Sequence, residues 1–265
     1  MNRLIFCDVD GTIKDGTRGM IEVSPKTKYA FDELKRNGDY VIISSGRSRC
    51  MMDEYILSLN ASGYICCNGA YSEIDGKCVY AEPLDKMEIE MLIDYCDNND
   101  GAYFLETAEN IFVRDNKEYL IKLFTESWNV DFDFINIDSL DRDYYMAMTI
   151  FKTPEEGMKF ERDMMNVFDI RQQNGYLSSD VNKKGINKGV GVDKIIEYLN
   201  IDKDNTYAFG DGINDLEMLL KVKHAVIMKN AQEPLKSYGF EMTDDVLEDG
   251  FYNYLVRNGL IRPMQ

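Results

Sequence analysis

Two aspartates separated by one residue follow a short apolar run near the tenth position of the chain. Residues 4–12 read LIFCDVDGT, so Asp8 and Asp10 come just before Gly11. Alternate residues of a strand face the same way, and this spacing therefore predicts that the two carboxylates lie together at a strand tip. Two like charges this close are costly unless a cation lies between them or one carboxylate keeps its proton. Phosphoryl-transfer chemistry can use both solutions. The alternative is a strand and an Asp-Gly turn with solvated acids.

Three later segments combine with this pair into an ordered pattern. Residues 41–47 (VIISSGR) end an apolar strand in a hydroxyl and a glycine, Lys188 lies in the run GINKG, and residues 208–215 (AFGDGIND) end another strand in acids. Together the four segments resemble the motifs of the haloacid dehalogenase superfamily of aspartate-nucleophile phosphatases. Within it the chain resembles the Cof-like hydrolases with a large type IIB cap, which dephosphorylate small metabolites.

The alternation of strand and helix patterns predicts an α/β fold. We expect a Rossmann-like, doubly wound parallel-sheet core over residues 1–81 and 185–265, with an inserted α+β cap domain over residues 82–184. Because α/β sheets bind ligands at the carboxyl ends of their strands, the four motifs should meet at one edge of this core.

The local patterns predict elements along both parts of the chain. In the core we expect a helix from Pro25 to about Asn37, an apolar helical face over 51–59, a strand over 63–67, a hairpin at 75–76 and a helix through 192–199. In the insert we expect helices over 87–98, 119–128 and 154–168, strands over 103–105, 111–113 and 146–151, and a hairpin around 174–175.

The resemblance implies roles for the acidic residues. Asp8 is the expected nucleophile, which fits a chain whose only histidine is His224, because a carboxylate is ionised at neutral pH without a base. Asp10 is the expected general acid and base, and the resemblance also gives its backbone carbonyl to the metal. A hard, oxygen-only site suits Mg²⁺, with Asp211 as the third contact and Asp215 in support.

The same resemblance implies a set of phosphate- and substrate-binding residues: Thr12, Ser45, Gly46, Arg47, Asn68, Lys188 and Asn214. Five of these residues have a structural alternative. Thr12 and Ser45 could cap neighbouring elements, Asn68 could be a turn residue, and Arg47 and Lys188 could be solvated charges. Lys188 is the most informative, since a cation in the first turn of a helix costs roughly 0.3–1 kcal/mol unless nearby anions offset it.

Composition narrows the classes of partner. The formal net charge of −17 disfavours nucleic acid and anionic membranes, and it means that a phosphate site must be locally positive. The six cysteines form no C-x-x-C pair and are predicted to be reduced, mostly buried thiols, as in a cytoplasmic protein. No segment has the length and composition of a membrane span or a signal peptide. We expect a monomer or a weak homodimer.

The sequence thus predicts an Mg²⁺-dependent phosphatase of small phosphorylated metabolites, with sugar phosphates as the expected class, acting through an aspartyl-phosphate. One alternative is a phosphomutase or phosphotransferase on the same fold. Another, from a different class, is a receiver-like signalling protein whose aspartate is a phospho-acceptor, although a receiver is shorter and lacks the second acid. The insert, which contains none of the motifs, is expected to select the substrate.

Overall fold

The computed structural model describes residues 2–114 and 134–265, and it divides the chain into two compact units. Unit 1 comprises Met1–Ser45, Met52–Tyr80 and Asn187–Gln265, and unit 2 comprises Gly46–Met51 and Ala81–Ile186. The segment Gly46–Met51, expected in the core, therefore groups with unit 2. The helix predicted over 119–128 lies outside the described residues.

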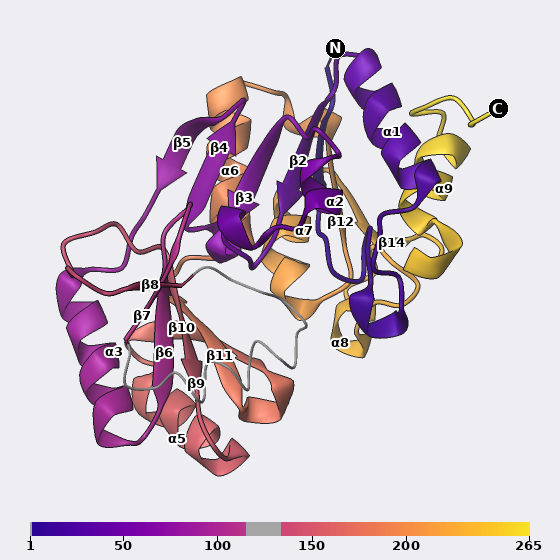
Figure 1. The fold of residues 1–265 in the computed structure, drawn as a ribbon. Helices are drawn as coiled ribbons and strands as arrows, with labels where there is room; N and C mark the ends of the chain where they lie inside the picture. The colour runs from indigo at the N-terminus through magenta and orange to yellow at the C-terminus, as the bar shows by residue number, and fades with distance from the viewer. Residues whose placement is uncertain (1, 115–133) are drawn as a thin grey trace. The chain divides into compact units, whose positions relative to one another are not determined.

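Unit 1 is built on a sheet of eight strands in the order β14-β13-β12-β1-β2-β3-β4-β5 (Figure 1). The strands from β14 to β3 run parallel and β4 runs antiparallel to β3, which confirms the predicted parallel sheet. The strands are β1 (Leu4–Cys7), β2 (Tyr40–Ser44), β3 (Gly63–Cys66), β4 (Tyr71–Ile74), β5 (Lys77–Ala81), β12 (Thr206–Gly210), β13 (His224–Ile227) and β14 (Glu241–Met242).

Helices cover both faces of this sheet, because successive strand residues point to opposite sides. On one face, Val192 and Met218 pack with Leu4 and Phe6. On the other, the Phe251 ring lies 4.9 Å from that of Phe209. The helices of unit 1 are α1 (Pro25–Arg36), α2 (Glu54–Leu57), α6 (Lys188–Leu199), α7 (Leu216–Lys221), α8 (Glu233–Lys236) and α9 (Gly250–Arg257).

Local signals set the ends of α1 as predicted. The Ser24 hydroxyl accepts the N–H of Thr27 at 3.1 Å, Pro25 is the first helical residue, and Gly38 follows the end with φ +82°. The prediction of a single helix with an apolar face over residues 51–59 is wrong, because α2 spans only Glu54–Leu57. Asp53 caps the short helix α2 by accepting the N–H of Ile56, so the chain changes direction just before it.

Unit 2 contains a six-stranded sheet in the order β10-β11-β9-β6-β7-β8, in which β7 and β8 are parallel and the other described pairs are antiparallel. Two helices pack on one face through Leu92, Phe160, Tyr103 and Val181. Its elements are α3 (Lys86–Asn98), β6 (Ala102–Glu106), β7 (Ile111–Val113), β8 (Phe134–Asn136), β9 (Met146–Ile150), α5 (Pro154–Met164), β10 (Phe168–Gln173) and β11 (Ser178–Lys183).

The predicted elements of unit 2 are present with one difference among the described residues. The helix expected over 154–168 ends at Met164, because Phe168 already begins β10 and pairs with Lys183. The hairpin around Gly175 joins β10 to β11, with φ +63° at that glycine.

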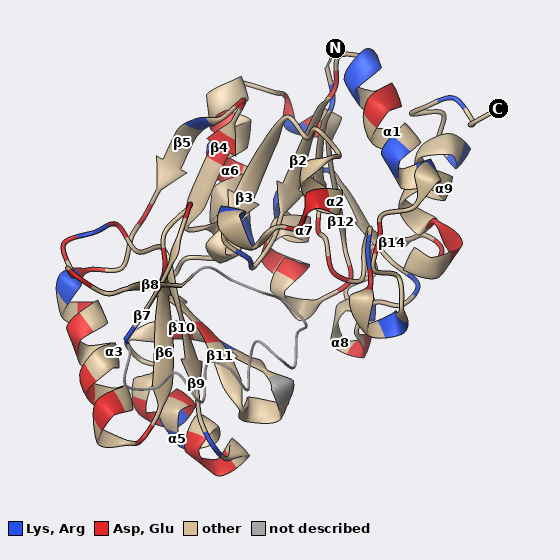
Figure 2. Ribbon diagram, viewed as in Figure 1, with Lys and Arg blue, Asp and Glu red and all other residues tan. Residues whose placement is uncertain are grey.

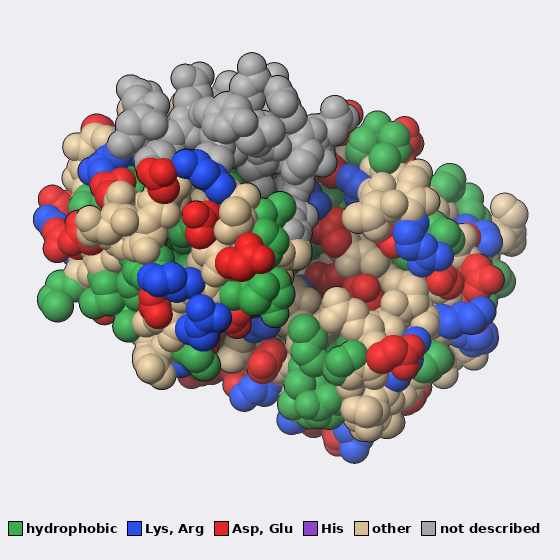
Figure 3. All heavy atoms as spheres, turned by 90° about the horizontal axis from the view of Figure 1, so that it is seen from below, with side chains coloured by type: hydrophobic (Ala, Val, Ile, Leu, Met, Phe, Trp, Pro, Cys, Tyr) green, Lys and Arg blue, Asp and Glu red, His purple; other side chains and the backbone are tan. Residues whose placement is uncertain are grey.

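The acidic composition is visible on the surface. Acidic residues recur along α3 (Figure 2), and the face drawn in Figure 3 mixes acidic, basic and apolar side chains. Cys7, Cys66, Cys67 and Cys96 are buried, and none of the six cysteines, all of which lie in the described part of the chain, is in a disulfide. Among the described residues, no helix combines the length and apolar character needed to cross a bilayer.

Candidate active site

The carboxyl ends of three neighbouring parallel strands bring the predicted residues of unit 1 together. β1 lies between β12 and β2, so Asp8, Asp211 and Ser45 follow adjacent strand ends. The first turn of α6 adds Lys188, whose helix is capped by Asn187. This edge of the sheet is where parallel α/β folds place ligands.

Lys188 is the centre of the site. Its side chain is fully buried, and its Nζ donates to Asp8 Oδ1 and to Asp215 Oδ1, each at 2.6 Å. A buried ammonium at a helix N-terminus is stable only when anions compensate for it. The solvated-lysine alternative is therefore wrong.

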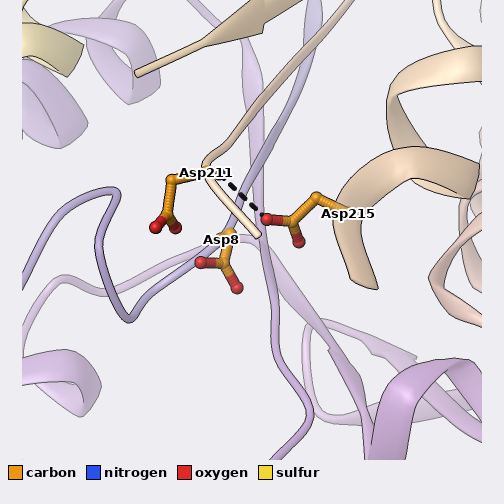
Figure 4. Close-up of side chains that lie close together, drawn as sticks. All are labelled: Asp8, Asp211 and Asp215. Atoms are coloured by element: carbon orange, nitrogen blue, oxygen red, sulfur yellow. Dashed lines mark hydrogen bonds between the residues drawn. The ribbon is translucent and has the colours of Figure 1, made fainter. Parts of the chain in front are cut away.

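Asp215 ties the loop after β12 to this lysine. Its Oδ2 accepts the N–H of Asp211 (Figure 4) and the N–H of Gly212 at 3.0 Å each. Its Oδ1 accepts a hydrogen bond from Lys188. Gly210 leaves the space that this carboxylate needs, since a Cβ there would lie 2.6 Å from Asp215 Oδ2. Asp215 is fully buried, but both of its carboxylate oxygens accept hydrogen bonds.

Asp211 sits against the turn that follows Asp8. The hydroxyl of Thr12 donates to its Oδ1 at 3.3 Å. Gly11 has φ +88°, and a Cβ at this position would lie only 2.1 Å from Asp211 Oδ2. Glycine is therefore required here on two grounds, the left-handed backbone and the close carboxylate. Thr12 contacts a site carboxylate rather than merely capping a strand.

Asp10 does not extend the strand, contrary to the prediction from alternation. β1 ends at Cys7, and the Val9 carbonyl then accepts the N–H groups of Thr12, Ile13 and Lys14 in a tight turn. Asp8 is buried whereas Asp10 is exposed on this turn. The charge of Asp10 nevertheless acts on Asp8, where it is among the influences that raise the pKa.

Ser45 and Asn68 are joined through their backbones. The N–H of Ser45 donates to the Ile65 carbonyl at 2.8 Å, and its carbonyl accepts the N–H of Asn68 at 3.2 Å. Asn68 is buried with φ +52°, as its turn alternative predicts. The next residue, Gly69, lies so close to α6 that a Cβ would be 2.0 Å from the Asn187 carbonyl. The β2 and β3 loops are thereby held beside the start of α6.

Burial has the largest effect on the pKa values of Asp8 and Asp211. Burial, followed by the charge of Asp215, raises the pKa of Asp8 to about 7 despite the opposing effect of Lys188. Burial and the charges of Asp8 and Asp215 raise the pKa of Asp211 to about 8. Burial acts to lower the pKa of Lys188, but the two carboxylates beside it outweigh this effect and raise that pKa.

The cluster has the donor set of a hard cation. Asp8, Asp211 and Asp215 each offer a carboxylate oxygen, and these atoms lie within 4.8 Å of one another (Figure 4). When all groups are ionised, three carboxylates and the ammonium of Lys188 leave two negative charges. The residues therefore fit a divalent cation that prefers oxygen ligands, such as Mg²⁺.

The remaining predicted residues are Asn214, Gly46 and Arg47. Asn214 is half-buried within the turn Ile213–Asp215. Gly46 and Arg47 follow Ser45 directly and belong to unit 2. Their substrate-binding roles stay predictions.

Two residues after β13 bond to the site loops and were missed by the sequence analysis. Asn230 donates to the Gly11 carbonyl at 2.8 Å, and Gln232 accepts the N–H of Ile213 at 3.2 Å. In the sequence, the only feature that could have pointed to these residues is the Asn-Ala dipeptide that follows a strand. The adjacent Lys229 is exposed, and its Nζ lies 3.5 Å from Glu248 Oε2.

Comparisons with known proteins agree with this geometry. A family model described as haloacid dehalogenase-like hydrolase matches residues 5–255. "Putative phosphatase YkrA" of Bacillus subtilis (strain 168) is 31% identical over 98% of this chain and 99% of that protein. "5-amino-6-(5-phospho-D-ribitylamino)uracil phosphatase YitU" of the same organism is 27% identical over 95% of this chain and 96% of that protein.

The fold is shared with a solved structure. A hypothetical protein from Geobacillus kaustophilus HTA426 has a TM-score of 0.88 and 28% identity, with 98% of this chain and 100% of that chain covered. The family predicted from the four motifs is therefore confirmed. The chain belongs to the haloacid dehalogenase-like hydrolases and is an enzyme of the phosphatase type.

Proposed function

We propose that this enzyme is an Mg²⁺-dependent phosphatase of small phosphorylated metabolites, with Asp8 as its covalent nucleophile. The observation that carries the proposal is the cluster of three carboxylates, those of Asp8, Asp211 and Asp215, at the carboxyl edge of a parallel sheet, where the buried Lys188 bonds to Asp8 and Asp215. Such an excess of negative charge costs free energy unless a cation compensates for it. A site with a purely structural role would offer no reason for this free-energy cost.

The proposed first step forms a bond between Asp8 and phosphorus. Lys188 holds Asp8 Oδ1, so we assign the attack to Oδ2. As the bond from phosphorus to the leaving oxygen breaks, Asp10 gives that oxygen its proton and the alcohol departs. Asp10 lies on the exposed turn after β1, where a proton can be exchanged with solvent.

The second step reverses these roles. Asp10 takes a proton from a water molecule, whose oxygen attacks the phosphorus of the aspartyl-phosphate, and the bond to Asp8 breaks to release inorganic phosphate. Lys188 would compensate for negative charge on the phosphoryl oxygens throughout, and Ser45 would donate a hydrogen bond to one of them.

The metal belongs to the same proposal. Asp8 and Asp211 would hold Mg²⁺ with the Asp10 carbonyl, and we assign Asp215, whose oxygens already accept two amides and Lys188, to fixing the loop and the lysine. Bound Mg²⁺ would supply positive charge that favours approach of a phosphate dianion to Asp8.

Sugar phosphates and related polyhydroxylated phosphates are the proposed substrate class. The curated relative YitU is named for a phosphorylated ribitylamino compound, which supports a phosphate ester on a polyhydroxylated chain. The inserted unit 2 is the proposed source of selectivity, as a separately folded domain could bind the non-reacting part of the substrate.

A phosphate-release screen tests the proposal. Sugar phosphates, sugar-alcohol phosphates and nucleotides would be assayed with Mg²⁺, after EDTA treatment, and with Ca²⁺ in place of Mg²⁺. We expect turnover with Mg²⁺ alone, because the larger and looser coordination of Ca²⁺ misplaces the nucleophile. Full activity after exhaustive chelation would contradict the metal, and transfer of the phosphoryl group to a second sugar rather than to water would favour a phosphomutase.

A further inference from the structure

Two loops of unit 1 carry the site carboxylates, and residues 228–232, which follow β13, bond to both. The N–H of Met228 donates to the Gly210 carbonyl at 3.1 Å, and the N–H of Gln232 donates to the Asp211 carbonyl at 2.8 Å. This segment therefore fixes the backbone of the loop that presents Asp211.

The side chain of Asn230 reaches from the same segment to the other loop. Its Nδ2 donates to the Gly11 carbonyl at 2.8 Å, and its Oδ1 accepts the N–H of Val246 at 3.0 Å. The Val246 bond settles which end of the amide faces Gly11. Gly11 lies directly after Asp10 and leaves the space for Asp211. Residues 228–232 therefore link the two loops, through backbone bonds to Gly210 and Asp211 and through the Asn230 side chain to Gly11.

We propose that Asn230 is a positioning residue for the divalent-cation site, which acts by holding the Gly11 turn at a fixed distance from Asp211. This inference rests on the proposed function, since it takes the carboxylates to bind Mg²⁺. Groups that orient metal ligands without touching the metal typically contribute 10–100-fold to affinity. Lys229 has no part in it, as its side chain is exposed beside Glu248.

Calorimetric titration of Mg²⁺ into the metal-free protein tests the proposal without relying on turnover. Asn230→Ala removes both bonds. Asn230→Asp keeps an oxygen for the Val246 N–H but replaces the donor to the Gly11 carbonyl by a carboxylate oxygen, so it removes the Gly11 bond, keeps the Val246 bond and adds a negative charge. We expect Mg²⁺ affinity to fall about 10–100-fold in both variants, with much of the activity restored at saturating Mg²⁺.

Asn253→Ala is the matched control. The amide of Asn253 also makes two bonds in unit 1, to Asp244 Oδ2 and to the Glu248 carbonyl, each at 2.8 Å. A role in folding alone would lower thermal stability in all three variants and leave their Mg²⁺ affinity equal to that of the wild type.

The outcomes separate this inference from the proposed function. Wild-type Mg²⁺ affinity in both Asn230 variants would overturn the inference, and so would a failure of both to fold while Asn253→Ala folds normally. If the wild-type protein itself neither bound Mg²⁺ nor released phosphate, the proposed function would fail and the inference with it.

Discussion

Asp10 is the residue whose proposed role depends most on the substrate. A proton donor matters when the leaving group is a poor one, such as a sugar alkoxide, and matters little for an aryl oxide. Asp10→Asn should therefore slow sugar phosphate hydrolysis by about 10²–10⁴-fold while sparing the first half-reaction with p-nitrophenyl phosphate. Pre-steady-state release of the two alcohols measures this, and equal losses on both substrates would rule out proton transfer by Asp10.

Glu106 offers a test of buried charge in unit 2. This last residue of β6 is fully buried, and burial raises its pKa from 4.5 to about 8. Between these pH values the folded protein keeps a proton that the unfolded chain releases, so the free energy of unfolding should fall as pH rises from about 4.5 to about 8. The slope approaches about 1.4 kcal/mol for each pH unit.

Glu106→Gln should remove the contribution of Glu106 to this pH dependence, because the amide is neutral throughout. Denaturant unfolding at pH 5, 7 and 9 would show the variant gaining stability over the wild type as pH rises, by a total of a few kcal/mol. Glu90→Gln, at an exposed position of α3, is the control. Parallel stability curves for wild type and Glu106→Gln would mean that Glu106 ionises without cost.

Among the elements, the turn after β1 carries the sharpest steric requirement. Gly11→Ala would place a Cβ 2.1 Å from Asp211 Oδ2 at φ +88°, so the turn or the carboxylate must move. We expect Mg²⁺ affinity and kcat/KM each to fall at least tenfold. Gly16→Ala is a control in the same loop, since nothing lies within 4 Å of the added Cβ. Equal effects of the two substitutions would show that the Gly11 turn does not set the site.

The elements also show what the sequence could and could not predict. Capping chemistry predicted α1, and the strand-plus-acid pattern predicted the segments that carry Asp8 and Asp211, because these signals are local. The geometry of Asp10 was mispredicted because strand alternation was extended past Cys7 into a turn whose hydrogen bonds converge on Val9. Asn230 was missed because its bond to Gly11 spans more than two hundred residues, which no local pattern reports.

For the whole molecule, the dominant physical quantity is its negative charge. With 47 acidic and 30 basic side chains, the chain should repel the phosphorylated substrates proposed for it. At saturating Mg²⁺, raising KCl from about 20 to about 200 mM should increase kcat/KM by screening this repulsion, and more for a sugar bisphosphate than for a monophosphate. A decrease for both substrates would show that local positive charge dominates their approach.

The central claim for the molecule as a whole is that its fold makes Asp8 a covalent nucleophile. The most direct measurement mixes Asp10→Asn with p-nitrophenyl phosphate and Mg²⁺, quenches in acid during the burst of p-nitrophenol, reduces with borohydride and maps the product by mass spectrometry. An aspartyl-phosphate would be reduced to homoserine, and the account predicts this change at position 8, with none in Asp8→Asn. A stoichiometric burst that leaves Asp8 unmodified, or homoserine at another position, would contradict it.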